Sequence, residues 1–218
     1  MENLELVLPE IFLSISIMFL LILGVFKKNS SKLIQTISLI VLLITTMITF
    51  NETLSIEKML LFNNSIIVDY LSSFMKIITL IAAFFVLLIS SSYLGIFKIL
   101  KIEYPILILS SVLGMMIMIS SNDLIVFYMG LELQSLALYV LATFNRDQLK
   151  SSEAGLKYFV LSALSSGLLL YGCSLIYGFT GSTNFNLIAS QLNSEEYALT
   201  FGIVFILVGL AFKISAVP

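Results

Sequence analysis

The sequence predicts an all-α membrane protein, a single transmembrane domain over residues 1–218 with about seven spans. Three observations support this fold class. Hydrophobic residues make up 59% of the chain and charged residues 11%, and the mean hydropathy is +1.09, far from the values of soluble proteins. The apolar residues form runs of about 20, the length that a membrane-spanning helix needs. The loops between the runs alternate in charge.

The composition also excludes several kinds of site. With no histidine and one cysteine, Cys173, the chain lacks the residues of common metal centres, disulfides and iron–sulfur clusters. A soluble catalytic domain is excluded because the longest connections, Asn51–Asp69 and Phe179–Thr200, are each about twenty residues long and cannot bury a core alone.

The apolar runs are expected to be helices, because each can satisfy its own backbone hydrogen bonds in lipid and none alternates like a barrel strand. The first run is too long for a signal peptide, and Glu2, Glu5 and Glu10 stand where such a peptide carries positive charge. Each following run lies between loops that hold polar or charged residues. The expected spans are, in order, Pro9–Phe26, Leu33–Phe50, Ile77–Leu94, Tyr104–Ser120, Asp123–Phe144, Gly155–Gly178 and Phe201–Pro218.

Lysine and arginine residues predict the orientation, because cationic loops stay on the side from which insertion occurs. The N-terminus and the second, fourth and sixth loops carry a single cation, Lys58, and many carboxylates. We therefore expect the N-terminus outside and the end of the seventh span inside. The cations of the first, third and fifth loops are Lys27, Lys28, Lys32, Lys98, Lys101, Arg146 and Lys150.

Three lysines and one glutamate remain within or beside the spans. Lys76 lies at the outer entry of the third span, where we expect its long side chain to reach the interface. Lys157 is in the first turns of the sixth span, where its side chain either reaches the membrane interface or joins a polar site within the membrane. Glu132 and Lys213 lie near the middle of the fifth and seventh spans, too deep for their side chains to reach the interface.

A charge at the centre of a bilayer costs about 2.5–3.5 kcal/mol on the insertion scale, so Glu132 and Lys213 each need a partner or water. We expect Glu132 to face Lys213, with Lys157 as an additional candidate, across a hydrated helix interface. A purely structural ion pair stays open as an alternative, although such pairs are weak stabilisers. Residues that could hold a chain of water molecules are Gln134, Ser135, Ser165 and Ser166.

Small residues indicate where these helices touch. Gly202 and Gly209 share one stripe of the seventh helix with Lys213. Ala163 and Gly167 form a small-xxx-small pair on the sixth helix, a pattern that lets helices approach closely. Ser162 and Ser166 stand beside that pair.

The seventh helix is expected to break near Lys213–Ser215. Pro218 follows shortly after Lys213, removes a backbone donor and clashes with the preceding turn. Broken helices near the midplane are typical of ion sites in transporters.

A buried glutamate–lysine pair suits proton transfer. Burial disfavours the charged form of both groups and their mutual attraction favours it, so a modest change in hydration or nearby charge can shift a proton. The hypothesis from the residues is a proton relay. Lys213→Met or Glu132→Gln is then expected to abolish or strongly reduce proton movement without preventing insertion.

Three segments closely resemble the subunit 2 (chain N) family of the respiratory NADH:ubiquinone oxidoreductase, complex I. They are Asp123–Leu136, Glu153–Gly167 and Gly209–Pro218. The run Tyr171–Phe185 resembles the mitochondrial and alphaproteobacterial branch of that family. The resemblance extends over essentially the whole chain.

The resemblance implies the first half of an antiporter-like fold in a proton-translocating subunit of the membrane arm. It implies that Glu132, Lys157 and Lys213 are the pumping residues and that Cys173 is a packing residue. It also implies that FMN, iron–sulfur clusters and ubiquinone are bound by partner subunits, so this chain contributes to the NADH:ubiquinone reductase without a cofactor or metal of its own.

Expected partners are other membrane-arm subunits and lipids, and no nucleic acid. The expected location is the mitochondrial inner membrane, with a bacterial cytoplasmic membrane as the alternative. Family members usually continue beyond the residue that matches Pro218 with a second set of helices. We therefore expect either a second chain that carries the C-terminal half or a partial sequence.

Functions of other classes stay open at this point. A subunit of a multisubunit cation/proton antiporter shares the core motifs, and a scaffold that pumps nothing fits the same helices. A seven-span receptor accounts for the glycosylation sequons Asn51–Thr53 and Asn63–Ser65. The receptor is disfavoured because there is no second cysteine for an extracellular bridge and because Lys213 has no role in it.

Overall fold

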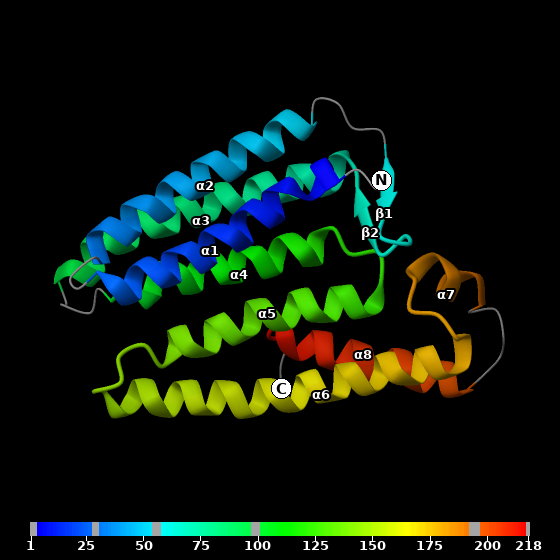
Figure 1. Cartoon of the computed structure of the whole chain (residues 1–218). Coiled ribbons are helices and arrows are strands. Elements are labelled where there is room, and N and C mark those ends of the chain that lie inside the picture. The colour runs from blue at the N-terminus through cyan, green and yellow to red at the C-terminus, as the bar shows by residue number, and fades with distance from the viewer. Residues whose placement is uncertain (1–3, 28–30, 54–57, 97–100, 192–196, 217–218) are drawn as a thin grey trace.

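The computed structural model describes residues 4–27, 31–53, 58–96, 101–191 and 197–216. These residues form long α-helices, a short 3-10 helix and a two-stranded hairpin (Figure 1). The elements are η1 (Leu4–Val7), α1 (Leu8–Phe26), α2 (Ser31–Thr53), β1 (Met59–Leu61), β2 (Ile66–Val68), α3 (Tyr70–Ile96), α4 (Glu103–Ile119), α5 (Leu124–Ala142), α6 (Leu149–Thr180), α7 (Phe185–Gln191) and α8 (Tyr197–Lys213).

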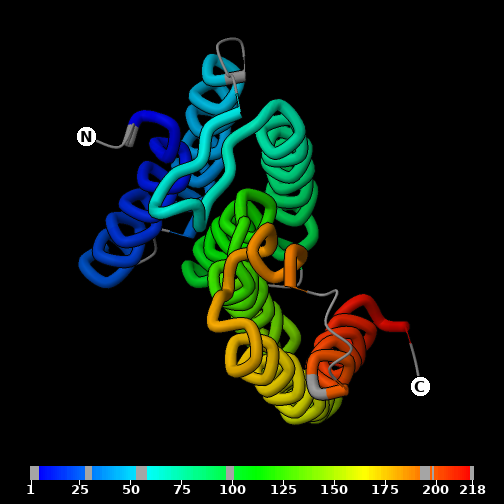
Figure 2. Tube along the Cα trace, turned by 90° about the vertical axis from the view of Figure 1, so that its right-hand side faces the viewer, coloured from blue at the N-terminus to red at the C-terminus, as the bar shows by residue number. Residues whose placement is uncertain are grey.

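The long helices form two groups, each with its own apolar core. The first group is α1 to α4, with a core that includes Leu20, Leu42, Leu87 and Leu109. The second group is α5, α6 and α8, with a core that includes Leu169 and the predicted packing residue Cys173. Figures 1 and 2 show the second group lying along one side of the first, joined to it through α4 and α5.

Two glycines bring the backbones of α4 and α5 into direct contact. A Cβ added at Gly114 would lie 2.6 Å from the Gln134 nitrogen, and one added at Gly130 would lie 2.7 Å from the Met118 nitrogen. No side chain fits in that space, so both positions require glycine. The two helix groups are therefore held together by backbone packing at their junction.

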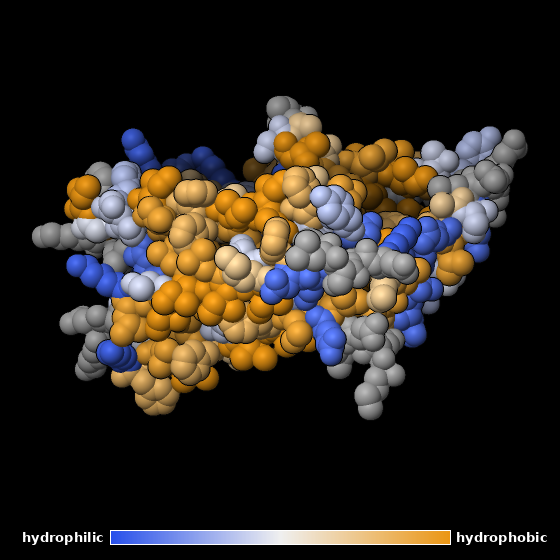
Figure 3. Space-filling model, turned by 90° about the horizontal axis from the view of Figure 1, so that it is seen from above, coloured by the Kyte–Doolittle hydropathy of each residue, from blue (hydrophilic) through white to orange (hydrophobic). Residues whose placement is uncertain are grey.

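All seven apolar runs coincide with helices, and five of these are long and apolar enough to cross a membrane. The helices Glu103–Ile119 and Leu199–Lys213 are apolar but shorter. The number of seven spans and the orientation therefore stay predictions. Figure 3 shows that the face seen from above is largely apolar, as expected for a surface in contact with lipid.

Several helices start earlier than predicted. α3 begins at Tyr70, α6 at Leu149, and α8, which corresponds to the predicted seventh span, at Tyr197. Polar residues at these starts end an apolar run but continue a helix, so hydropathy marks the lipid core rather than the end of the helix. The 32 residues of α6 correspond to about 48 Å, longer than the roughly 30 Å of a hydrocarbon core.

A β-hairpin, which the sequence analysis did not predict, occupies part of the second connection. β1 and β2 pair antiparallel with Leu61 opposite Ile66. The turn holds three residues at positive φ, namely Phe62, Asn63 and Asn64. Asparagine tolerates this conformation better than most residues, which explains why the turn falls here.

Hydrogen bonds tie this hairpin to the start of α5. The Asn64 carbonyl accepts hydrogen bonds from the side chains of Asn122, at 2.8 Å, and Asn184, at 2.9 Å. Asp123 caps α5 by accepting from the Ile125 backbone at 2.8 Å. The hairpin, the α4–α5 turn and α7 thus share one end of the bundle and fix where α5 begins (Figures 1 and 2).

Candidate functional site

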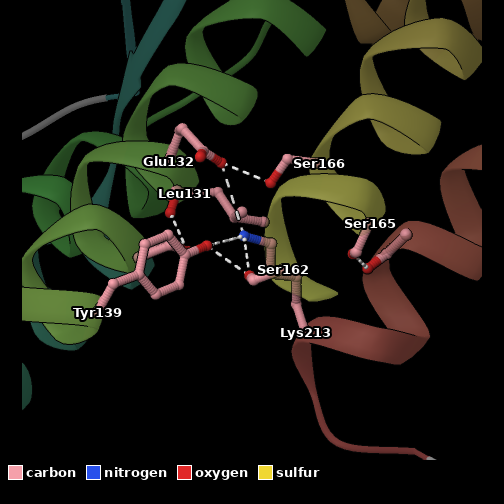
Figure 4. A network of polar contacts seen from close by, with 9 residues as sticks. Leu131, Glu132, Tyr139, Ser162, Ser165, Ser166 and Lys213 are labelled. Carbon is pink, nitrogen blue, oxygen red and sulfur yellow. Dashed lines mark hydrogen bonds and ion pairs between the residues drawn. The ribbon is translucent and has the colours of Figure 1, made fainter. Parts of the chain in front are cut away.

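Lys213 is the last residue of α8, and its ammonium group lies between α5 and α6 (Figure 4). It donates hydrogen bonds to the hydroxyl groups of Ser135 at 2.9 Å and Tyr139 at 3.0 Å, both on α5. It also donates to the Ser162 hydroxyl on α6 at 3.1 Å. The ammonium group is therefore held from two helices by three neutral acceptors.

Glu132 supplies the opposite charge. Its Oε2 atom lies 3.5 Å from Lys213 Nζ, and the two side chains are 22% and 11% exposed. The same oxygen accepts a hydrogen bond of 2.7 Å from the Ser166 hydroxyl on α6. The carboxylate is thus fixed by α6 and α8 together, and both charged side chains are mostly buried.

Tyr139 and Ser162 also hydrogen-bond to each other. The Tyr139 ring is packed edge-on against Tyr158 and Phe159, with centroid distances of 4.8 and 5.7 Å. This packing fixes the direction of the phenol hydroxyl. We call the set Glu132, Ser135, Tyr139, Ser162, Ser166 and Lys213 the Lys213 cluster.

Helical spacing explains why these residues meet. Glu132, Ser135 and Tyr139 fall at i, i+3 and i+7, so they share one stripe of α5. Ser162 and Ser166 are spaced at i, i+4 on α6 and are both buried. Each stripe therefore presents polar groups to the same interface.

Gly209 brings α8 close enough for Lys213 to reach that interface. A Cβ at this position would lie 2.7 Å from the Leu169 Cβ and 3.1 Å from the Ser165 carbonyl oxygen. The Ser165 hydroxyl donates a hydrogen bond of 3.0 Å to the Gly209 carbonyl. The contact fixes α8 against α6 one turn before Lys213.

The end of α8 lies at the predicted place. Ser215 adopts a left-handed conformation with φ of 57°. The Ala216 amide donates to the Ala211 carbonyl at 2.9 Å, and the Ser215 amide donates to the Phe212 carbonyl at 3.0 Å, the pattern of a Schellman motif. The position of Lys213 in the last turn also stabilises its positive charge through the helix dipole. Pro218, which motivated the prediction, lies outside the described residues.

Several sequence-based expectations for this site agree with the structure. Glu132 faces Lys213, and Ser135 and Ser166 contact that pair. The side chain of Gln134 makes no hydrogen bond within the described part of the chain, and Ser165 binds the α8 backbone instead of a charge.

Two hydroxyl groups of the site, those of Tyr139 and Ser162, were missed by the sequence analysis as ligands of Lys213. Their spacing, at i+7 from Glu132 and four residues before Ser166, was the signal that could have found them.

Lys157 is not brought to this cluster. Its ammonium group lies 2.6 Å from Glu153 on the same helix, and its side chain is 67% exposed. Lys157 and Ser166 are about two and a half turns apart on α6, so they point to opposite sides of the helix. Of the two alternatives that the sequence left open for Lys157, the structure favours the exposed position over a contact with Glu132.

The expectation that Lys76 reaches the interface is wrong. Lys76 is 2% exposed, and its ammonium group lies 2.5 Å from Glu10 Oε1 on α1. Because α3 already begins at Tyr70, Lys76 lies well inside the helix and turns toward the bundle. Glu10, which opens the first span in sequence, lies in α1 and is buried with it.

The small-residue pair on α6 is also not the one in contact. Ala163 and Gly167 are exposed, and a Cβ at Gly167 would meet nothing within 4 Å. The contact with α8 uses Gly172, whose added Cβ would lie 2.8 Å from the Gly202 carbonyl oxygen. The predicted stripe of Gly202 and Gly209 on α8 is confirmed.

Among the described residues, no group of three or more carboxylate, cysteine or histidine side chains is placed to hold a metal ion. The polar chemistry of the Lys213 cluster is limited to one ammonium, one carboxylate and four hydroxyl groups. Such groups bind, hold and pass protons.

Comparison with known proteins places these features in a family. Residues 121–218 match the family described as NADH:quinone oxidoreductase/Mrp antiporter, TM. The chain is 71% identical to NADH-quinone oxidoreductase subunit N of Pelagibacter ubique, over 100% of this chain and 46% of that protein. It is 54% identical to the subunit N of Bartonella bacilliformis, over 99% of this chain and 44% of that protein.

Solved structures share the fold. Respiratory complex I from Thermus thermophilus with bound aureothin contains a chain with a TM-score of 0.78 and 26% identity, covering 95% of this chain and 44% of that one. A chain of the archaeal membrane-bound sulfane sulfur reductase has a TM-score of 0.80 at 24% identity, over 94% and 44% of the two chains. A chain of the Mrp complex from Dietzia has a TM-score of 0.76 at 22% identity, over 98% and 41%.

The chain spans 44% to 46% of the length of the two curated relatives named above. Its helices have the antiporter-like arrangement of these membrane complexes. Along its whole length, with 71% identity, the chain matches a part of NADH-quinone oxidoreductase subunit N.

Proposed function

We propose that this chain is the part of a proton-translocating membrane-arm subunit of NADH:quinone oxidoreductase that contains a Glu132–Lys213 proton relay. The observation that carries the proposal is the Lys213 ammonium group, held by three hydroxyl groups beside a single carboxylate. The names of the bacterial relatives supply the enzyme. Because the chain spans less than half of their length, the complete activity also requires the region that matches their remainder.

The relay works through the charge on Glu132. At an effective dielectric constant of about 20, unit charges 3.5 Å apart attract by about 4–5 kcal/mol before screening by water. Protonation of Glu132, or its movement away from Lys213, therefore favours release of the lysine proton.

Hydroxyl groups offer a path for the released proton. Tyr139 and Ser162 accept from Lys213 and hydrogen-bond to each other. A hydroxyl group that takes a proton from the ammonium passes its own proton to the next oxygen, so each hydroxyl group ends the step unchanged. The lysine becomes neutral, and the proton leaves through the last oxygen of the chain to water.

Lys157 has a separate place in the proposed relay. It pairs with Glu153 on an uncovered face of α6, so it exchanges protons with Lys213 only through residues or water outside the described contacts. We assign it to proton entry or exit at the edge of the subunit, with Glu132 and Lys213 at the centre.

The redox chemistry belongs to partner subunits in this proposal. FMN, iron–sulfur clusters and the quinone are bound there, and this chain contributes proton movement to the NADH:quinone reductase. The partners are other membrane-arm subunits, lipids and the region that matches the second half of the relatives, in this or a separate chain. Because the relatives named above are bacterial, we favour a bacterial cytoplasmic membrane over the mitochondrial inner membrane.

A subunit of a multisubunit cation/proton antiporter is the second candidate. The matching family covers both NADH:quinone oxidoreductases and Mrp antiporters, and the fold is shared with an Mrp complex. Purification from native membranes separates the two functions. NADH dehydrogenase activity in the isolated complex supports the first, whereas sodium-dependent proton flux without any redox activity supports the second.

The relay itself is tested by NADH-driven proton pumping in vesicles that contain the purified complex. Lys213→Met and Glu132→Gln are expected to reduce pumping strongly while the complex still assembles. Lys150→Met, at an exposed lysine in the first turn of α6, is the matched control and should pump normally. Unchanged pumping in Lys213→Met would reject the relay and favour a scaffold role.

A further inference from the structure

A second ion pair, more deeply buried than the first, lies in the first helix group, apart from the Lys213 cluster. Lys76 on α3 and Glu10 on α1 are 2.5 Å apart, with side chains only 3% and 9% exposed. Glu52, near the end of α2, interacts electrostatically with both. Three helices therefore bring two carboxylates and one ammonium group together, and this arrangement has an excess of negative charge.

A cavity of about 390 Å³ opens beside this pair. Its wall is mostly apolar and comes from η1, α1, α3, α4 and the hairpin, which places it at the hairpin end of the bundle. The polar residues in the wall are Glu10, Ser14, Lys76 and Ser120.

Two buried oxygen atoms beside this cavity lack a hydrogen-bond partner. Glu10 and Ser120 line the cavity, and Glu10 Oε2 and Ser120 Oγ have no hydrogen-bond partner among the described residues. A buried carboxylate oxygen without a partner is costly, and ordered water is the usual remedy where space allows. A water molecule needs about 30 Å³, so the cavity has room for several.

We propose that Glu10, Glu52 and Lys76 form a second proton-holding site, which exchanges its proton with water through this cavity. Two carboxylates near one ammonium group repel each other in a medium of low dielectric constant, and one bound proton removes that repulsion. Among the described residues, the charged groups at this site are these three, from α1, α2 and α3. Ser120, which directly follows α4, contributes a hydroxyl group, and the hairpin contributes apolar side chains.

The second site is independent of the Lys213 cluster. It lies on helices of the other group and shares no residue with the proposed relay. Its proton is exchangeable because the cavity connects it to the hairpin end. Failure of the relay in the vesicle assay would therefore leave this proposal unaffected.

Infrared spectroscopy of the intact complex in lipid tests the bound proton. A protonated carboxyl group has a carbonyl band that an ionised one lacks, and that band shifts in D₂O. We expect Glu10→Gln to lose one such band near neutral pH, because Glu52 then pairs with Lys76 alone. Glu103→Gln, an exposed residue at the start of α4, is the matched control and should keep the band. Identical spectra for the parent and Glu10→Gln would overturn the proposal.

A second pair of variants tests the cavity and does not depend on a charge change. Ile117 lines the cavity, so Ile117→Phe fills part of it and Ile117→Leu does not. After transfer to D₂O, the carboxyl band is expected to shift more slowly in Ile117→Phe than in Ile117→Leu. Equal rates in both variants, or a high-resolution structure with a lipid chain in place of water beside Glu10, would contradict exchange through the cavity.

Discussion

Tyr139 is the residue that joins the charged and neutral parts of the Lys213 cluster. Its hydroxyl group accepts from Lys213, hydrogen-bonds to Ser162, and is oriented by the ring contacts with Tyr158 and Phe159. The ring and the hydroxyl group therefore have separable roles. A phenylalanine in its place keeps the packing and removes only the hydrogen bonds.

We accordingly predict that Tyr139→Phe folds and assembles but pumps protons more slowly than the parent. A lost hydrogen bond to a charged group costs about 1.5–3 kcal/mol, and the two remaining hydroxyl acceptors keep Lys213 in place. NADH-driven pumping and thermal stability of the complex measure both effects. Tyr171→Phe, an exposed tyrosine on α6, is the control. Equal pumping in the two variants would remove Tyr139 from the proton path.

Lys157 provides a comparison at the same scale. Because its ammonium group is exposed and pairs with Glu153, we expect Lys157→Met to reduce pumping less than Lys213→Met does. The two variants are compared in the same vesicles at equal protein content. A loss in Lys157→Met as large as that in Lys213→Met would place Lys157 at the centre of the relay.

The central charges of the site and their mutual contact were predictable from the sequence, whereas the Tyr139 and Ser162 hydroxyl groups and the Glu10–Lys76 pair were not. Glu132 and Lys213 stand out because a charge in mid-membrane needs an explanation. Lys76 and Glu10 gave no such signal, since each lies near the end of an apolar run where contact with water is the ordinary outcome. Their pairing depends on how α1 and α3 rotate against each other, which only packing decides.

At the scale of the elements, the approach of α8 to α6 determines where Lys213 lies. Gly209 allows it, because an added Cβ would be 2.7 Å from the Leu169 Cβ. We predict that Gly209→Ala separates the two helices, costs about 1–3 kcal/mol, and reduces pumping through displacement of Lys213. Thermal unfolding and pumping are the measurements.

Gly167→Ala is the matched control, because a Cβ there meets nothing within 4 Å. It should leave stability unchanged or slightly raised, since alanine favours helix over glycine. If both variants lost the same stability, the α6–α8 contact would not be the one that the structure shows.

The sequence predicted the helices better than their contacts. Apolar run length located every long helix, because lipid requires internally satisfied backbones. It did not locate the hairpin, whose strands of three residues are too short to give a periodic pattern. It also chose Ala163 and Gly167 over Gly172 as the contact on α6, because small residues mark several faces and only the neighbouring helix selects one.

At the scale of the whole molecule, the charge of the loops predicts the orientation. The hairpin end should face outside and the fifth loop inside. We predict that a membrane-impermeant maleimide labels Asn64→Cys from the outside of sealed vesicles. Asp147→Cys should react only after the vesicles are opened. Both are placed in a Cys173→Ala background, which removes the buried native thiol. The reverse pattern of labelling would invert the topology.

The two helix groups each contain an ion pair among the described residues, the buried Glu10–Lys76 pair in the first and the partly buried Glu132–Lys213 pair in the second. Buried pairs seldom stabilise a protein more than apolar packing would. Two of them in one membrane domain therefore favour a role in charge movement over a role in stability. The Gly114–Gly130 contact between α4 and α5 joins the two groups at backbone distance.

A double-mutant cycle on NADH-driven proton pumping tests the central claim most directly. The complexes to be compared are the parent, Glu132→Gln, Lys213→Met and the variant with both changes, each reconstituted at equal content. If the two residues act as one relay, the double variant pumps about as poorly as Lys213→Met alone. Once Lys213 is replaced, Glu132 no longer takes part in proton transfer, so its loss has no further effect. Losses that multiply, or pumping at the parent rate in either single variant, would contradict the account.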